Sequence, residues 1–214
     1  MVDAKISGLY VIVDPDACLG REALDVARQA LEGGASMLQW RDKRREKGAQ
    51  LPVARALREL CAEHGALLIV NDHADLALAA GADGVHVGQG DLPVEAVRHV
   101  VPSGFIVGAS TNNVSEALRA EAAGASYIAI GSIFPTSSKE PERTRAASPA
   151  RLSEVKAAVG VPVVAIGGID ASNIDEVVRA GADAVAVISA VCSADDPEQA
   201  ARELAERQVK RSAF

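Results

Sequence analysis

The sequence predicts an α/β protein that folds as a single (β/α)8 TIM barrel over residues 1–214. Apolar stretches typical of strands alternate eight times with amphipathic stretches typical of helices, at nearly even spacing. Hairpin signals are rare between consecutive strands, which favours parallel pairing. The competing architecture is an open doubly wound sheet. Its first strand would lead into G-x-G-x-x-G, and VDPDACLGRE at 13–22 lacks that pattern, so we predict the barrel.

An internal repeat supports this interpretation. GGASMLQW, AGADGVHV, AGASYIAI and AGADAVAV start at residues 33, 80, 123 and 180. In each copy a glycine follows an alanine-rich helical stretch and is suited to the left-handed position that ends a helix. The alanine and the small polar residue after it then form a short loop into a strand.

These anchors place the elements in chain order. Strands are expected near 9–14, 37–41, 67–71, 84–88, 105–109, 127–131, 163–167 and 184–188. Helices are expected near 21–32, 50–64, 74–80, 93–101, 114–123, 149–159, 173–180 and 197–208. Pro52, Pro93, Pro149 and Pro197 would lie near helix starts, where proline is tolerated.

Composition narrows the functional class. The chain is 49% hydrophobic and carries a net charge of −7, with acidic and basic residues mixed along it, so we expect no nucleic-acid partner. No apolar run is long enough to span a bilayer, and we expect no membrane partner and no signal peptide. Three widely spaced cysteines form neither a disulfide framework nor a zinc pattern, which favours the cytoplasm.

Barrel enzymes place their chemistry at the carboxyl ends of the strands. The second strand ends in Gln39-Trp40-Arg41-Asp42-Lys43, where Gln39, Arg41 and Lys43 share one face and Trp40 and Asp42 the other. Two cations and an amide that point into the mouth indicate an anionic ligand, although the cations could simply be solvated.

The next two strands each end in an aspartate, Asp72 after Asn71 and Asp91 after GQG. An aspartate in such a place is often a turn former or a helix cap, and Asp91 precedes a helix. Two of them on adjacent strands beside basic residues point instead to Mg²⁺, which takes one or two carboxylates plus waters and substrate phosphates.

The remaining strand ends supply hydroxyl groups, glycine and a lysine. Ser110 ends the fifth strand, and a Ser/Thr run with Lys139 follows the sixth. Small residues after the seventh and eighth strands fit a phosphate site built from backbone amides. His86 is expected to be a hydrogen-bonded core histidine, and no Ser-His-Asp or Cys-His combination stands out.

Seven motifs in register carry a family resemblance. They are QWRDK at 39, ND at 71, GADGVHVGQGD at 81, GAST at 108, IFPTSSK at 133, AIGGI at 165 and VIS at 187. In order and spacing they resemble thiamine-phosphate synthase over nearly the whole chain. The resemblance implies a transferase on a (β/α)8 barrel that joins a hydroxymethylpyrimidine diphosphate to a thiazole phosphate. Thiamine phosphate and pyrophosphate are formed in a dissociative substitution assisted by Mg²⁺.

The resemblance also assigns residues. Arg41, Lys43, Ser110 and Lys139 would be catalytic, and Asp72 and Asp91 would bind Mg²⁺. The pyrimidine diphosphate would contact Gln39, Trp40, Arg41, Asp42, Lys43, Asn71, Ser110 and Lys139. The thiazole phosphate would contact Thr136, Ser137, Ser138, Gly168, Ile188 and Ser189.

Two alternatives stay open at this stage. A related thiazole tautomerase tends to lack the G-Q-x-D aspartate and to carry a histidine soon after the GAS serine, whereas this chain has Asp91 and Thr111-Asn112-Asn113. A non-catalytic sensor of phosphate ligands would lose Asp72, Asp91 or Lys139, and all three are present. The loop at 140–148 departs from the family, and the sequence leaves the oligomeric state open, a homo-oligomer included.

Overall fold

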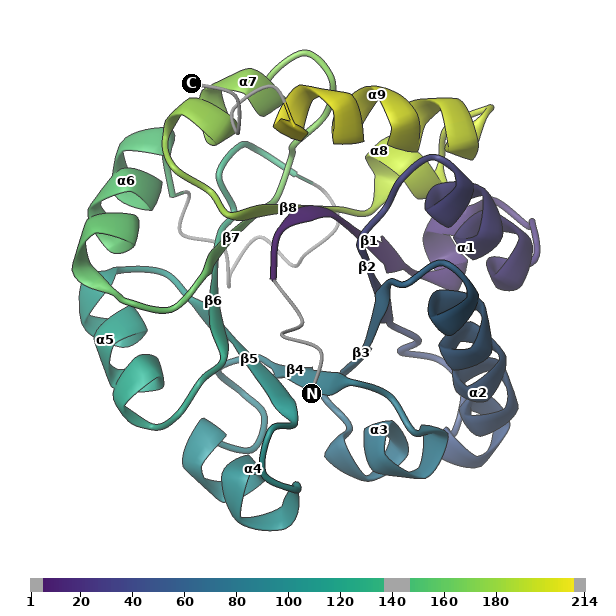
Figure 1. Cartoon of the computed structure of the whole chain (residues 1–214), viewed down its shortest axis with the longest axis horizontal. Coiled ribbons are helices and arrows are strands. Elements are labelled where there is room, and N and C mark those ends of the chain that lie inside the picture. The colour runs from purple at the N-terminus through teal and green to yellow at the C-terminus, as the bar shows by residue number, and fades with distance from the viewer. Residues whose placement is uncertain (1–5, 137–146, 210–214) are drawn as a thin grey trace.

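The computed structural model describes residues 6–136 and 147–209. Within these residues eight parallel strands close into one barrel in chain order, with helices around the outside (Figure 1). The predicted (β/α)8 barrel is thereby confirmed. The strands are β1 (Gly8–Val13), β2 (Met37–Trp40), β3 (Leu67–Asn71), β4 (Gly84–Val87), β5 (Ile106–Thr111), β6 (Tyr127–Ile130), β7 (Val163–Ile166) and β8 (Ala184–Val187).

The helices agree with the predicted positions to within a few residues. Their bounds are α1 (Ala23–Glu32), α2 (Lys47–Glu63), α3 (Ala74–Ala80), α4 (Val94–Val100), α5 (Val114–Ala122), α6 (Pro149–Ala158), α7 (Ile174–Arg179) and α9 (Pro197–Val209). Two short elements were not predicted, a 3-10 turn η1 (Pro15–Cys18) and α8 (Ser189–Cys192). Four residues are too few to show a helical period.

One helix start was predicted too late. Helix α2 begins at Lys47, so Pro52 lies inside the helix and not at its first turn. Proline there costs the hydrogen bond to the carbonyl of Gly48. The helix continues nevertheless, because Leu57 and Leu60 on its inner face are buried against the barrel.

The internal repeat has a structural cause. The glycine directly before the shared alanine has positive φ in every copy (97° at Gly34, 70° at Gly81, 97° at Gly124 and 107° at Gly181), as predicted for helix ends. The polar residue two positions later ties its loop to the neighbouring strand. The Asp83 carboxylate, for example, accepts a hydrogen bond of 2.8 Å from the backbone N–H of Leu68, at the amino end of β3.

Side chains alternate between two apolar layers. The outer layer packs between strands and helices and contains most of the core, including Trp40. The inner layer fills the barrel with Tyr10, Met37, Ile69 and Tyr127 among its larger members. On β6 and β8 the inward residues nearest the mouth are small, Ala129 and Ala186, which leaves room above them.

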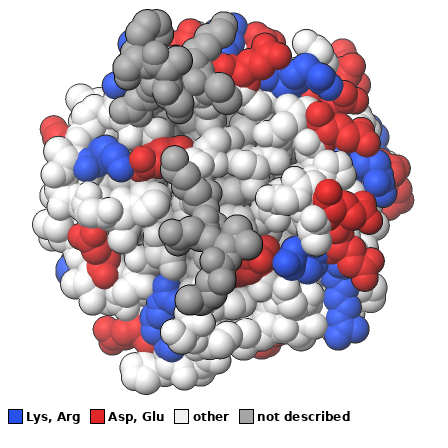
Figure 2. All heavy atoms as spheres, in the orientation of Figure 1, with Lys and Arg blue, Asp and Glu red and all other residues white. Residues whose placement is uncertain are grey.

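The surface carries charges of both signs. On the face shown in Figure 2, acidic and basic side chains are intermixed around the rim. None of the helices in the described part of the chain has the length and apolarity that crossing a bilayer requires.

Candidate active site

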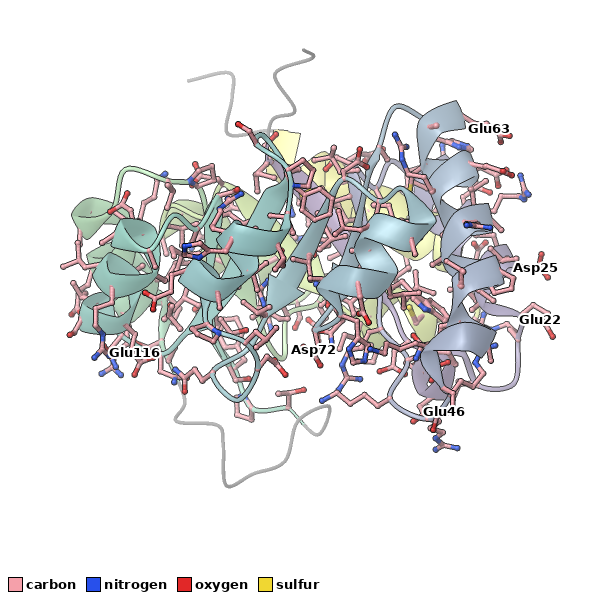
Figure 3. The ribbon with its side chains drawn as sticks, turned by 90° about the horizontal axis from the view of Figure 1, so that it is seen from below. Glu22, Asp25, Glu46, Glu63, Asp72 and Glu116 are labelled. Carbon is pink, nitrogen blue, oxygen red and sulfur yellow. The ribbon has the colours of Figure 1, made fainter. Side chains whose placement is uncertain are left out.

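The polar residues at the strand ends lie at one end of the barrel. Figure 3 shows Asp72 and Glu116 at one edge of the molecule and Glu63, at the end of α2, at the opposite edge. Asp72 directly follows β3, so the edge with Asp72 is the carboxyl end of the strands.

Strand β2 holds a cation at the mouth through a partner that the sequence analysis missed. The Arg41 guanidinium forms an ion pair with the carboxylate of Asp14, at the end of β1. Both side chains are largely buried, 17% and 8% exposed. Asp14 is itself held by the N–H of Asp16, which donates to it at 3.0 Å. Lys43, two residues beyond Arg41, is exposed. The sequence feature that identified Asp72 and Asp91, a carboxylate directly after a buried strand, is also present at Asp14 and could have revealed it.

Trp40 and Asp42 do not join this cluster. The indole Nε1–H of Trp40 donates to Gln50 in α2 at 3.1 Å, and the ring is buried between strand and helix. Asp42 accepts the backbone N–H groups of Arg44 and Arg45 and pairs with the Arg45 guanidinium. Their side chains face the helices because a strand alternates its faces. In the structure both side chains support the loop after β2, and their assignment as substrate contacts stays a prediction.

Asp72 and Asp91 lie next to each other. Burial and then the adjacent Asp91 carboxyl group raise the pKa of Asp72, and Lys43 opposes this shift. Asp72 has a left-handed backbone (φ 61°), and its N–H donates to the carbonyl of His86 at 2.8 Å. A non-glycine residue adopts such a φ at some cost, and such residues gather at functional sites.

Asp91 is not a helix cap. Its carboxylate accepts the N–H of Gly88 at 2.8 Å, while the residue before α4 is Pro93. The turn therefore holds the carboxylate beside Asp72.

The two carboxylates suit a hard cation. Within residues 6–136 and 147–209 there is no cluster of three or more His, Cys, Asp or Glu side chains that could form a complete protein cage. Mg²⁺ needs no such cage, because it keeps several waters and binds one or two carboxylates together with substrate phosphates. Two adjacent carboxylates that repel each other fit that requirement.

Ser110 points into the barrel from β5 and meets His86 of β4. Its Oγ lies 2.8 Å from Nε2 of His86, and Nδ1 of that imidazole lies 2.9 Å from the hydroxyl of Tyr127. His86 is thus the hydrogen-bonded core histidine that was predicted, and its bond to Ser110 was not foreseen. Ser110 also lines a cavity of about 480 Å³ together with Asp91.

Gln39 and Asn71 flank this group from β2 and β3. The Gln39 side chain is buried, and its amide donates to the Tyr10 hydroxyl at 2.6 Å. Asn71 is half-buried and pairs in register with His86. Like Ser110, both amides therefore point toward the interior of the barrel.

A second cavity, of about 380 Å³, opens at the ends of β6, β7 and β8. Four of the predicted phosphate-binding residues line it, namely Thr136, Gly168, Ile188 and Ser189. Ser137, Ser138 and Lys139 lie outside the described residues.

Close backbone packing shapes this cavity. At Gly168 (φ 65°) an added Cβ would come within 2.4 Å of the Pro135 carbonyl oxygen. At Gly167 (φ 100°) it would come within 2.2 Å of the Ser132 hydroxyl. Ser132 is buried, and its carbonyl accepts the N–H of Ala147, which anchors the chain after 137–146. Glycine is thus required for the segment after β6 to lie against the end of β7.

Comparison with known proteins identifies the family. A family model described as thiamine monophosphate synthase matches residues 9–191. A thiamine-phosphate synthase of Methanoculleus marisnigri is 50% identical over 199 residues, which are 93% of this chain and 94% of the relative. The chain belongs to the thiamine monophosphate synthase family.

Solved structures agree with this membership. A thiamine phosphate pyrophosphorylase from Pyrococcus furiosus superposes with a TM-score of 0.90 at 40% identity, covering 97% of this chain and 98% of that one. A 3-hexulose-6-phosphate synthase superposes with a TM-score of 0.70 at 21% identity, which shows the shared barrel alone. The family resemblance inferred from the seven motifs is therefore confirmed.

Other parts of the site had no local signal. Tyr10 and Tyr127 contact each other through hydroxyls 3.1 Å apart although 117 positions separate them. Each has the appearance of an ordinary core aromatic in its own strand. Only closure of the barrel brings them together, and none of the seven motifs given above includes either residue.

Proposed function

We propose that the protein is a thiamine-phosphate synthase that joins a hydroxymethylpyrimidine diphosphate to a thiazole phosphate and releases pyrophosphate. Family membership makes it a transferase. The observation that carries the proposal is the division of one barrel mouth into two anion sites. A carboxylate pair beside Lys43 lies over β3 and β4, with Arg41 held by Asp14 at the end of β2, and a glycine-lined cavity lies over β6–β8.

The leaving diphosphate belongs at the first of these sites. Asp72 and Asp91 would hold Mg²⁺, which when bound supplies positive charge to the departing pyrophosphate. Arg41 and Lys43 add charge there, and the Asp14 ion pair fixes the direction of the guanidinium before the substrate arrives. Such preorganised charge stabilises a leaving anion without reorganisation during the reaction. Lys139, assigned by the family pattern, would join them.

The pyrimidine ring belongs inside the mouth. Gln39, Asn71 and Ser110 supply its polar contacts, and the side chains of all three point into the barrel interior. The aminopyrimidine stabilises positive charge on the carbon that loses the diphosphate, so a dissociative substitution follows. The residues then have to orient the ring and exclude water.

The thiazole phosphate belongs in the second cavity. Thr136 contributes a hydroxyl, and Ser189 begins α8, whose first N–H groups have no partner within the helix. The glycines after β7 let the backbone approach a phosphate closely. Ser137 and Ser138 are assigned to this phosphate by the family pattern. With both substrates held, the thiazole nitrogen attacks without a strong protein base, and positioning provides much of the rate.

The cysteines indicate the cellular compartment. We place the enzyme in the cytoplasm, since Cys18, Cys61 and Cys192 are buried free thiols. Its partners are then the two small-molecule substrates, and a homo-oligomer stays a prediction that light scattering would test.

The test is to mix the protein with hydroxymethylpyrimidine diphosphate, thiazole phosphate and Mg²⁺ and to follow pyrophosphate and thiamine phosphate together. We expect equal amounts of the two products, abolished by a chelator and restored by excess Mg²⁺. Binding of thiazole phosphate without product would contradict the proposal, and would make the barrel a tautomerase or a sensor.

A further inference from the structure

A chain of hydrogen bonds crosses the barrel interior and ends at Ser110. Gln39 Nε2 lies 2.6 Å from the Tyr10 hydroxyl, which lies 3.1 Å from the hydroxyl of Tyr127. The Tyr127 hydroxyl lies 2.9 Å from Nδ1 of His86, whose Nε2 lies 2.8 Å from Ser110 Oγ. The five side chains come from β2, β1, β6, β4 and β5, so strands from both halves of the barrel contribute.

The supply of protons gives this chain a direction. A tyrosine hydroxyl has one hydrogen to donate, and a neutral imidazole carries one N–H. Gln39 donates through its amide, so Tyr10 accepts at that end. Either tyrosine could donate to the other, but the Tyr10 hydrogen has an acceptor in this chain only if Tyr10 donates to Tyr127. Tyr127 in turn donates to Nδ1 of His86.

The direction continues to the mouth. An imidazole that accepts at Nδ1 carries its hydrogen on Nε2 and donates it to Ser110 Oγ. Ser110 then accepts from His86, and its own hydrogen is left to donate elsewhere. His86 is the one hydrogen-bond partner of the Ser110 hydroxyl among the residues that the structure describes.

Burial keeps the two tyrosines in their donor form. Both hydroxyls are enclosed in the inner core, and burial raises the pKa of Tyr10 and of Tyr127 above the ordinary value. Neither hydroxyl therefore loses its hydrogen near neutral pH, and each can donate only one hydrogen bond.

Packing fixes the position of Tyr127. Its ring stacks on the His86 imidazole with centroids 5.5 Å apart and meets the Tyr10 ring edge-on at 6.3 Å. The ring also lies directly over Gly108, where an added Cβ would come within 2.1 Å of its Cζ. Glycine at 108 is thus what allows the hydroxyl to reach Nδ1.

We propose that Tyr127 is a positioning residue that holds His86 as its Nε2–H tautomer, so that Ser110 donates a hydrogen bond into the site. The acceptor is a ring nitrogen of the pyrimidine, an identification that rests on the proposed function. In this arrangement His86 cannot take a proton from Ser110, so the pair is not a nucleophile and its base. Tyr127 acts through His86 and Ser110 without touching the substrate.

The tautomer can be read directly by nitrogen NMR on protein labelled at its histidines, with the His86 signal assigned by its loss in His86→Gln. At about pH 8, where an imidazole of ordinary pKa is neutral, we expect a protonated Nε2 and an unprotonated Nδ1. Tyr127→Phe removes the donor to Nδ1 and keeps the ring, so we expect the two nitrogens to become mixed in protonation.

Tyr10→Phe is the matched control. It removes a buried hydroxyl from the same chain, and Nδ1 of His86 is then the acceptor that the described side chains leave to the Tyr127 hydroxyl, so we expect the wild-type tautomer. If the tyrosines had a merely structural role, both variants would change the His86 tautomer to the same extent. A wild-type His86 with its hydrogen on Nδ1, or the same tautomer in Tyr127→Phe, would overturn the proposal. These outcomes need no substrate, so they are independent of the proposed function.

Kinetics give the second readout. We expect Tyr127→Phe to raise KM for the pyrimidine diphosphate by about five- to tenfold, the worth of one ordinary hydrogen bond, and to leave KM for thiazole phosphate unchanged. Equal increases in both constants would indicate a general loss of packing and contradict the assignment.

Discussion

Asp72 carries its carboxylate beside that of Asp91, at a backbone geometry (φ 61°) that non-glycine residues adopt at a cost. A half-buried carboxylate with a like neighbour is destabilised in two ways, by loss of hydration and by charge repulsion. The fold keeps it there through the hydrogen bond from its N–H to the His86 carbonyl. A site of this kind is stabilised when a cation arrives.

The sign of this effect on stability can be predicted. Because the pKa of Asp72 is raised in the folded protein, its contribution is favourable at acid pH and is lost as the pH rises through that raised pKa. Asp72→Asn should therefore raise the free energy of unfolding at about pH 8 more than at about pH 4. Thermal unfolding of both proteins at the two pH values, in chelator, measures the difference.

Asp75 offers a control of opposite sign. Its hydrogen bond with Lys47 lowers its pKa, so its contribution is present near neutral pH and is lost as the pH falls through the lowered pKa. Asp75→Asn should therefore lower stability slightly at about pH 8. Added Mg²⁺ should stabilise the wild type and Asp75→Asn but not Asp72→Asn. The same rise in melting temperature for all three proteins would contradict a metal at Asp72.

At the scale of elements, the cavity over β6–β8 depends on how closely neighbouring loops approach. The segment after β6 pairs with the end of β7 through the N–H groups of Ile133 and Phe134. Gly168 leaves the space that the Pro135 carbonyl occupies. The cavity is therefore a product of backbone packing more than of particular side chains.

Gly168→Ala tests this point against a matched glycine. Gly81 has a similar backbone (φ 70° against 65°), but nothing lies within 4 Å of an added Cβ. We expect Gly81→Ala to cost about 1–2 kcal/mol of left-handed strain and to leave kinetics unchanged. Gly168→Ala should cost about 1–3 kcal/mol more and raise KM for thiazole phosphate roughly tenfold. Denaturant unfolding and initial rates measure both, and identical behaviour of the two variants would refute the packing argument.

Helix α8 depends on an arginine from the far end of the sequence. The Arg21 guanidinium donates to the carbonyls of Cys192 (2.7 Å) and Ala194 (2.8 Å), while its Nε donates to Cys18 at 3.1 Å. It thereby ties the end of α8 to η1, and α8 in turn presents Ser189 to the cavity. Four residues would not hold a helix by themselves.

Removal of the Arg21 guanidinium should loosen α8, which lines the cavity over β6–β8. Arg21→Ala is expected to cost about 2 kcal/mol, which lowers the melting temperature by roughly 4–8 °C. KM for thiazole phosphate should rise while KM for the pyrimidine diphosphate stays the same. Arg28, exposed on α1, provides the control, since Arg28→Ala should change neither constant. An unchanged thiazole phosphate KM in Arg21→Ala would show that α8 is held by other contacts.

At the scale of the whole molecule, the sequence predicted the barrel because its strands and helices have clear periods and because one loop pattern recurs. The recurring glycine and polar residue each answer a local requirement, a left-handed helix end and a bond to the neighbouring strand. In a barrel of this kind the active site lies at the carboxyl ends of the strands. Once the strands were predicted, Asp72, Asp91 and Ser110 could therefore be located at the mouth.

What the sequence could not supply depends on how the strands meet in the barrel. Closure brings Tyr10 of β1 to Tyr127 of β6 across the interior. The pairing of Arg41 with Asp14 instead joins the ends of the neighbouring strands β1 and β2, and it follows from their register. The family pattern also attributed Trp40 and Asp42 to the substrate, although strand alternation sends them to the helix layer. The motif gives the positions of these residues in the chain, and the structure adds the face to which each side chain points.

The most direct test of the whole account is the dependence of turnover on Mg²⁺ in Asp91→Asn. Asp91 shares the carboxylate pair but lies apart from the thiazole phosphate cavity. Initial rates of thiamine phosphate formation should fall by at least about tenfold and need more Mg²⁺, while KM for thiazole phosphate stays unchanged. Equal rates for Asp91→Asn and wild type across the whole Mg²⁺ titration would contradict a metal-assisted departure of pyrophosphate at this site.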